Sequence, residues 1–179
     1  MWLVKFWDVS SPIEVLPPVL DPDLQPIIHP IEPPIIETPV ETPNDKLIRI
    51  ADALALLNID VTPDDKIPDE VACVEVLCEV INKIIPFPRL SYTPDLVREL
   101  KTDKRFADTL DFNEASIIVN ATGTGNGTMR GHCGIIGTNN EIISNNSKTG
   151  KWEYNYTIKE WNDRFRVKGG MPTLLFKLI

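Results

Sequence analysis

The most informative stretch of the sequence is Gly131-His132-Cys133-Gly134-Ile135-Ile136-Gly137. Its significance depends on Cys73, which lies upstream in the chain. The chain has two histidines, and the other one, His29, lies among prolines. His132 is therefore the histidine in a segment that we expect to fold. A cysteine without a histidine nearby is usually a small buried hydrophobe. A cysteine paired with a histidine can be a nucleophile with its base. We therefore predict that Cys73 is a thiol nucleophile and His132 its base.

The segment around Cys73 predicts a buried helix over residues 68–85. Pro68 suits the first turn, and the two acidic residues after it suit the positive end of the helix dipole. A thiol near a helix N-terminus has a lowered pKa, which favours a nucleophilic thiolate at Cys73. Cys78 points away from the face of Cys73, since five residues turn a helix by about 140°. We assign Cys78 to the core.

The residues around His132 predict an antiparallel hairpin. Its parts are a strand at His132–Ile136, a turn at Thr138-Asn139-Asn140 and a strand at Glu141–Asn146. This pairing places His132 near Ser144 or Asn146, which share a face of the second strand. An oxygen there would hold the imidazole tautomer. We favour Asn146 over Ser144, since an amide oxygen is the better acceptor. The alternative is ordinary polarity at a turn and a strand end.

The remaining pattern alternates short helices with strands. We expect helices over 44–58, with Asn44 as N-cap, from Thr93 onward, and over 157–165, where Thr157 and Glu160 form a capping box. We expect strands over 115–120 and 172–178 and a charged turn over 103–106. The glycine-rich loop 123–127 lacks the lysine of a phosphate-binding loop and precedes a strand, so we reject nucleotide binding.

The first forty-three residues differ in composition from the rest. Residues 12–43 hold ten of the sixteen prolines, and this density favours an extended polyproline arm. The domain organisation is thus an arm over 1–43 and one domain over 44–179. Many residues between the prolines are Ile, Val or Leu, so two interpretations stay open. The arm is either a semi-rigid linker or a strap that docks on a protein partner or on its own domain.

Composition excludes several classes of function. A net charge of -8 without a basic patch argues against nucleic acid as a partner. Three cysteines without a C-x-x-C pair argue against a disulfide framework. We see no signal peptide and no run of the ~18 apolar residues that span a bilayer. A zinc site from Cys73, Cys78, His132 and Cys133 lacks the usual ligand spacing, so we expect no metal and no cofactor.

Aromatic residues gather after the hairpin. Trp152 and Tyr154, with Tyr156, could line a groove that binds sugars or peptide. The alternative is half-buried packing on a sheet. We take Trp152 and Tyr154 as candidate substrate-binding residues.

The order of these elements resembles the NlpC-like and CHAP superfamily of papain-like cysteine peptidases and amidases, in its divergent phage-encoded branch. The likeness covers about residues 50 to 179. Four pieces carry it: Pro68-Asp69-Glu70-Val71-Ala72-Cys73, Asp103-Lys104-Arg105-Phe106, Gly131-His132-Cys133-Gly134-Ile135-Ile136, and Ile143-Ser144-Asn145-Asn146-Ser147-Lys148-Thr149-Gly150-Lys151-Trp152. Cys133 stands where such proteins more often have Val or Ala.

The resemblance implies an α+β fold of the papain-like type, in which the helix bearing the cysteine packs on an antiparallel sheet. It implies a hydrolase that cleaves peptide or amide bonds of cell-wall peptidoglycan, with Cys73 as nucleophile, His132 as base and a third polar residue between Ser144 and Asn146. Such a protein would act from the host cytoplasm on the cell wall, or be carried in a virion. The alternatives are a virion structural or assembly protein that kept the fold, and an enzyme acting on another acyl substrate.

Overall fold

The computed structural model of the chain describes residues 40–57 and 72–179. The described residues belong to one compact unit, Pro39–Ile179. Most of the predicted proline-rich arm, and the predicted start of the second helix at Pro68, lie outside the described residues. No helix among the described residues combines the length and the apolarity that crossing a bilayer requires.

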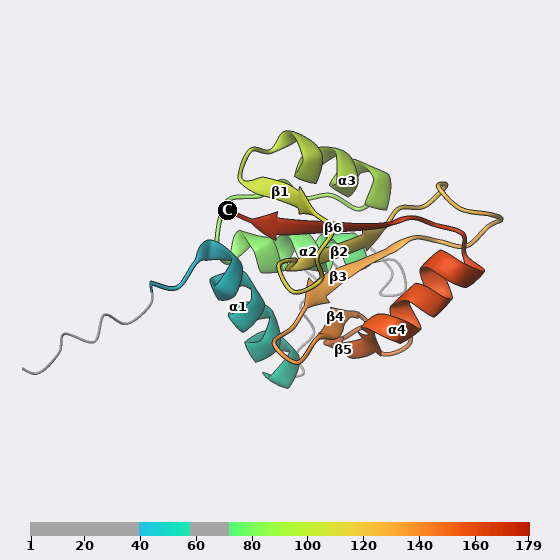
Figure 1. Cartoon of the computed structure of the whole chain (residues 1–179). Helices are drawn as coiled ribbons and strands as arrows, with labels where there is room; N and C mark the ends of the chain where they lie inside the picture. Colours follow the sequence, from blue (N-terminus) through green and yellow to red (C-terminus); the bar gives the residue numbers. More distant parts are fainter. Residues whose placement is uncertain (1–39, 58–71) are drawn as a thin grey trace, which may run out of the picture. The chain divides into compact units, whose positions relative to one another are not determined.

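The centre of this unit is a six-stranded sheet with the order β1-β6-β2-β3-β4-β5, in which every neighbouring pair is antiparallel (Figure 1). The strands are β1 (Phe106–Thr109), β2 (Ile117–Asn120), β3 (His132–Ile136), β4 (Glu141–Asn145), β5 (Trp152–Thr157) and β6 (Thr173–Leu178). The helices are α1 (Pro43–Leu57), α2 (Cys73–Asn82), α3 (Thr93–Thr102) and α4 (Ile158–Trp161), which continues as the π-helical segment η2 (Asn162–Lys168). The predicted α+β class is confirmed.

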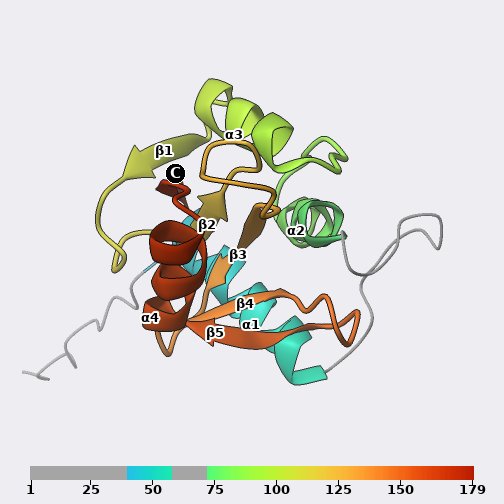
Figure 2. The same cartoon turned by 90° about the vertical axis from the view of Figure 1, so that its right-hand side faces the viewer.

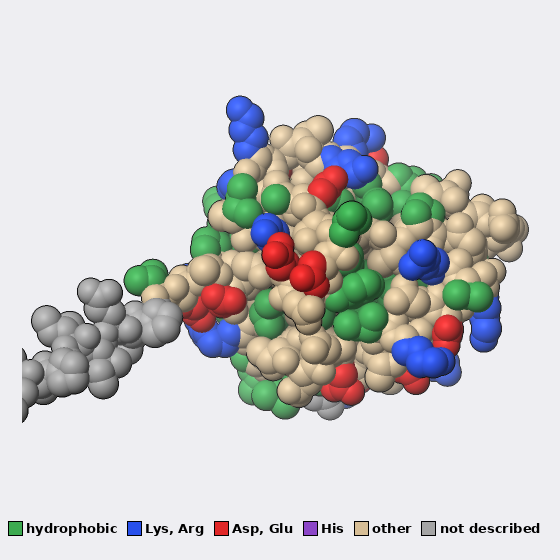
Figure 3. Space-filling model, in the orientation of Figure 1, with side chains coloured by type: hydrophobic (Ala, Val, Ile, Leu, Met, Phe, Trp, Pro, Cys, Tyr) green, Lys and Arg blue, Asp and Glu red, His purple; other side chains and the backbone are tan. Residues whose placement is uncertain are grey.

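Both faces of the sheet are covered, as Figure 2 shows for α2 and α4 on opposite sides. Alternate residues of one strand enter different cores: Ile117 packs in the larger core with α1, α2 and α3, whereas Ile118 packs in the smaller core under α4 and η2. This alternation explains the unbroken apolar runs of the central strands, since neither face is left for water. On the face shown in Figure 3, acidic and basic side chains are interspersed.

The start of α1 differs from the prediction. Thr42 rather than Asn44 caps it: the Thr42 hydroxyl accepts from the Asp45 N–H at 3.1 Å, and the Asp45 carboxylate accepts from the Thr42 N–H at 3.2 Å. The Asn44 side chain instead accepts from the Leu178 N–H at 3.1 Å. It thereby joins α1 to the end of β6, a long-range contact that local sequence does not reveal. The predicted helix exit at Asn58 lies outside the described residues.

Two local predictions are confirmed, and a third holds for part of its range: residues 104 and 105 form the predicted turn, in which the Phe106 N–H donates to the Asp103 carbonyl at 3.0 Å. Asn140 has a positive φ of 58° in the β3–β4 turn, and Thr157 and Glu160 form the reciprocal capping box of α4. The charged turn predicted over 103–106 runs into an unpredicted edge strand, β1, which starts at Phe106 and pairs with β6. Phe106 is buried against Phe87, with ring centroids 5.5 Å apart. Tertiary packing therefore fixes β1.

Candidate active site

The structure brings Cys73 and His132 together. Cys73 is the first residue of α2, a helix that packs on β3 and β4, and His132 is the first residue of β3. The side chains of His132 and Cys133 both lie close enough to the Cys73 thiol to lower its pKa. Cys73 and His132 also line one pocket of about 330 Å³. A nucleophile and a base at the mouth of one cavity form the arrangement that thiol acyl transfer requires.

Residues from several segments complete the pocket. Its other lining residues are Val74, Ser91, Tyr92, Thr93, Thr122, Arg130 and Gly131. Two hydrogen bonds connect three of these lining residues. The Gly131 N–H donates to the Thr122 hydroxyl at 2.8 Å, and the Thr122 N–H donates to the Thr93 hydroxyl at 2.9 Å. These bonds join the start of α3 to both ends of the β2–β3 loop, so the backbone beside His132 is held in place.

The wall that carries Ser91 and Tyr92 is anchored to α2. Glu75, which is buried, forms an ion pair with Arg89. The Asn82 side chain accepts from the Phe87 N–H at 2.8 Å and donates to the Phe87 carbonyl at 2.9 Å. The helix α2, which begins at Cys73, therefore also positions the segment that carries Ser91 and Tyr92.

Ser144, and not Asn146, is the polar partner of the imidazole. The Ser144 hydroxyl lies 3.1 Å from Nε2 of His132 and is fully buried. Asn146 lies beyond the end of β4, where its amide donates to Glu153 at 2.5 Å and accepts from the Lys148 N–H at 3.0 Å. The preference for Asn146 is thus corrected: its side chain stabilises the β4–β5 turn.

A β-bulge supplies a further contact to Ser144. The register of β4 and β5 shifts between Ile142 and Ile143, so that Asn155 has no direct partner across the ladder. Bulges re-aim side chains, and here Asn155 Nδ2 donates to the Ser144 hydroxyl oxygen at 3.1 Å. A serine oxygen has two lone pairs and can accept from Asn155 and from the His132 ring together. This contact engages Nε2 of His132 and leaves Nδ1 without a bond to Ser144.

Aromatic rings enclose the other side of the imidazole. Trp161 and Phe165 stack on His132 with ring centroids at 5.4 and 5.6 Å, and Tyr156 approaches edge-on at 6.1 Å. The Trp161 indole N–H donates to the buried Asn120 side chain at 2.5 Å. Asn120 lies directly across from His132 in the β2–β3 ladder. The ring of the candidate base is therefore held in one orientation.

The three cysteines have different electrostatic surroundings. Hydrogen bonding from Cys133, together with the hydrogen bond and charge of His132, holds the pKa of the Cys73 thiol well below its usual range despite burial. Burial raises the pKa of Cys133, and the neighbouring Cys73 adds to this effect. Burial also raises the pKa of Cys78 to about 12. Of the three cysteines, Cys73 is thus the one whose surroundings favour the thiolate, and Cys78 is a core residue as predicted.

The structure does not place the predicted substrate-binding residues at this pocket. Trp152 is fully buried, and its indole N–H donates to the Ala51 carbonyl at 3.2 Å. The Tyr154 hydroxyl donates to the Asp52 carboxylate at 2.9 Å. Both residues pack with α1, on the core side of β5. The prediction that they bind substrate is corrected: the alternative, packing on a sheet, describes them.

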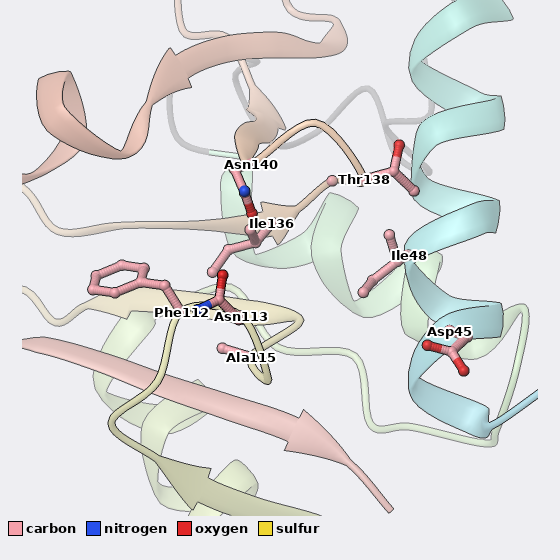
Figure 4. Close-up of a pocket in the computed structure, with 9 residues that line it drawn as sticks. Asp45, Ile48, Phe112, Asn113, Ala115, Ile136, Thr138 and Asn140 are labelled. Carbon is pink, nitrogen blue, oxygen red and sulfur yellow. The ribbon is translucent and has the colours of Figure 1, made fainter.

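A second pocket, of about 240 Å³, lies at the other end of β3 (Figure 4). Its lining includes Asp45, Ile136 and Asn140. Asp45 is already the partner of Thr42 at the start of α1. This pocket contains no nucleophile beside a base, so the pocket of Cys73 is the better candidate for chemistry.

Residues 40–57 and 72–179 contain no group of three or more His, Cys, Asp or Glu side chains placed to hold a metal ion. Sequence reasoning missed Asn155, Trp161 and Phe165. The one sequence signal for the two aromatic residues was their place in the predicted helix after Thr157.

Comparison of the chain with protein-family models, with curated proteins and with solved structures gives no match.

Proposed function

We propose that this chain is a cysteine peptidase or amidase that uses Cys73 as nucleophile and His132 as base, with Ser144 in the third position. The observation that carries the proposal is the shared pocket, lined by the Cys73 thiol and by an imidazole whose Nε2 lies 3.1 Å from the Ser144 hydroxyl. A thiolate of lowered pKa, an oriented base and an adjacent cavity are the parts that acyl transfer needs.

In the first step, Nδ1 of His132 takes the proton of the Cys73 thiol, and the thiolate attacks the carbonyl carbon of an amide. The Ser144 oxygen accepts from Nε2–H and stabilises the imidazolium that forms. The carbonyl oxygen becomes an oxyanion beside the first turn of α2. Ala72 at the N-cap offers no side-chain acceptor to the amides of that turn. Those N–H groups, at the positive end of the helix dipole, can donate to the oxyanion.

In the second step, the carbon–nitrogen bond breaks and His132 gives its proton to the leaving amine. The acyl group remains on Cys73 as a thioester. Water then attacks the thioester carbonyl and His132 takes the proton of that water. The tetrahedral intermediate expels the Cys73 sulfur, which releases the acid.

We further propose a papain-like fold of the NlpC and CHAP type and a bacterial cell-wall substrate, peptidoglycan. Support for the fold comes from α2, which begins at Cys73 and packs on the antiparallel sheet, and from the polar residue on β4 that contacts the histidine of β3. Support for the substrate comes from the likeness of the sequence around Cys73 and His132 to phage-type cell-wall hydrolases. A phage-encoded enzyme of this kind would reach the wall from the host cytoplasm or within a virion.

Digestion of purified peptidoglycan sacculi, with mass spectrometry of the released fragments, tests this function. The wild-type chain should release fragments with new amine and carboxyl ends, and Cys73→Ala should release none while remaining folded. Cys78→Ala is the matched control and should retain cleavage, since Cys78 is a core residue. Turnover by Cys73→Ala would contradict the proposal. Absence of turnover together with co-purification with virions would favour the structural role.

A further inference from the structure

Among the described residues that line the pocket of Cys73 and His132, one side chain, that of Arg130, is permanently charged. The remaining polar residues that line it are neutral hydroxyl-bearing ones, and no aspartate or glutamate is among its described lining residues. This positive charge stands out in a chain whose net charge is -8. A cation in a cleft attracts anionic ligands and raises their local concentration.

Within the described residues, Arg130 is exposed and forms no hydrogen bond or ion pair. Several other arginines there are matched with a carboxylate from the chain itself: Arg49 with Glu41, Arg89 with Glu75, Arg98 with Asp95 and Arg105 with Asp103. The N–H donors of the Arg130 guanidinium are thus available to a group that does not belong to the described residues.

The backbone next to Arg130 is fixed. Gly131 donates its N–H to Thr122 at 2.8 Å, and a Cβ at Gly131 would lie 2.2 Å from the Asn120 carbonyl oxygen. The chain therefore enters β3 along one path, with Arg130 two residues before His132. A side chain on such an anchored backbone is better placed for recognition than one on a mobile loop tip.

We infer that Arg130 is a specificity-determining residue that binds a carboxylate of the acyl substrate close to the scissile bond. A guanidinium presents two parallel N–H donors that match the two oxygens of a carboxylate. The substrate class is therefore a peptide or amide with a free carboxylate beside the bond that is cleaved, in preference to its neutral amidated form. This inference rests on the proposed function, since it takes Cys73 as the attacking atom.

The first test uses two alkylating reagents that differ only in charge. Iodoacetate carries a carboxylate where iodoacetamide carries a carboxamide, and both form a thioether with a thiolate and release iodide. The ratio of their rate constants at Cys73 cancels any change in the reactivity of the thiol itself. Peptide mass spectrometry assigns the modified cysteine, and Cys73→Ala gives the blank.

Arg130→Ala should lower the iodoacetate-to-iodoacetamide ratio about threefold, the size expected for a partly exposed charge pair. Arg130→Lys should keep most of the ratio, since it keeps the charge. Arg166→Ala is the matched control, because Arg166 is exposed and does not line the pocket. High salt should lower the ratio of the wild-type protein toward that of Arg130→Ala.

The second test uses paired peptides with a carboxylate or a carboxamide next to the scissile bond. Arg130→Ala should raise the KM of the carboxylate peptide about tenfold, as expected for loss of a charge-assisted hydrogen bond. It should leave the carboxamide peptide unchanged. The inference is supported if Arg130→Ala loses the preference for the carboxylate over the carboxamide with both the alkylating reagents and the peptides.

An unchanged ratio in Arg130→Ala, with Cys73 still reactive, overturns the inference and leaves the proposed function intact. A Cys73 that reacts with neither reagent overturns the proposed function, and the inference with it.

Discussion

The hydroxyl of Ser144 lies 3.1 Å from Nε2 of His132 and also accepts a hydrogen bond from Asn155. This contact engages one ring nitrogen of His132, and the proposed mechanism uses the other one for the Cys73 thiol. The stacked rings of Trp161 and Phe165 keep the imidazole from rotating away. The acid–base role proposed for His132 therefore depends on a short chain of buried polar contacts behind it.

Ser144→Ala should lower kcat roughly fivefold with little change in KM, because one hydrogen bond contributes about 1 kcal/mol to holding the base. Asn146→Ala is the matched control from the same hairpin and should keep the wild-type kcat. Steady-state kinetics on a peptide substrate, with thermal unfolding of both variants, checks this. An inactive Asn146→Ala beside a fully active Ser144→Ala would restore the assignment made from sequence.

Cys133→Val should raise the pKa of the Cys73 thiol, because the variant removes the hydrogen bond that most favours the thiolate. Only the thiolate is alkylated, so the midpoint of the pH profile of iodoacetamide labelling should move upward. Valine is larger than cysteine at this fully buried position, so thermal unfolding is measured alongside to show that the packing under β3 survives. A profile that superimposes on that of the wild type would show that Cys133 does not act on Cys73.

Gly131→Ala should destabilise the fold by about 1–3 kcal/mol, as overpacking usually does. The new Cβ would lie 2.4 Å from the Thr122 N–H and closer still to the Asn120 carbonyl oxygen, so the start of β3 must move. Urea unfolding measures the loss, and Cys73 labelling should slow as His132 shifts. Thr128→Ala, at an exposed position of the same loop, is the control. Unchanged stability in Gly131→Ala would contradict this packing.

Trp161→Phe keeps an aromatic ring over His132 but removes the indole N–H that Asn120 accepts. A buried acceptor left without a donor costs about 1–3 kcal/mol, and that loss should appear in urea unfolding. Cys73 labelling should change less than stability, since the stack persists. A variant as stable as the wild type would mean that Asn120 finds another donor.

The parts of the site that local patterns encode were predictable. A cysteine at a helix start, a histidine opening a hairpin strand and an asparagine in the turn at position 140 each follow from short-range rules. The parts that depend on tertiary contacts were not. Strand pairing predicted His132 near both Ser144 and Asn146. Only the hydrogen bonds within the β4–β5 turn show that the Asn146 side chain is engaged there instead of with His132. The contribution of Asn155 depends on a one-residue register shift that no pattern marks.

The error at Trp152 has a related cause. An aromatic residue in a strand has the same sequence pattern whether it faces a groove or a helix. Here α1, distant in sequence, covers it and accepts its indole N–H at the Ala51 carbonyl. Trp161 was missed for the same reason, because its role depends on stacking on His132, which lies on a strand distant in sequence from α4.

The central claim is that His132 activates the thiol of Cys73, and the pH dependence of iodoacetamide labelling in the wild type and in His132→Gln tests it most directly. Since the pKa of Cys73 is lowered, the wild type should stay reactive at pH values below the usual thiol range of about 8.5 and lose reactivity only in more acidic solution. His132→Gln removes the charge and the hydrogen bond of the imidazole, so its profile should shift toward that of an ordinary thiol. Identical profiles for the two proteins would contradict the account.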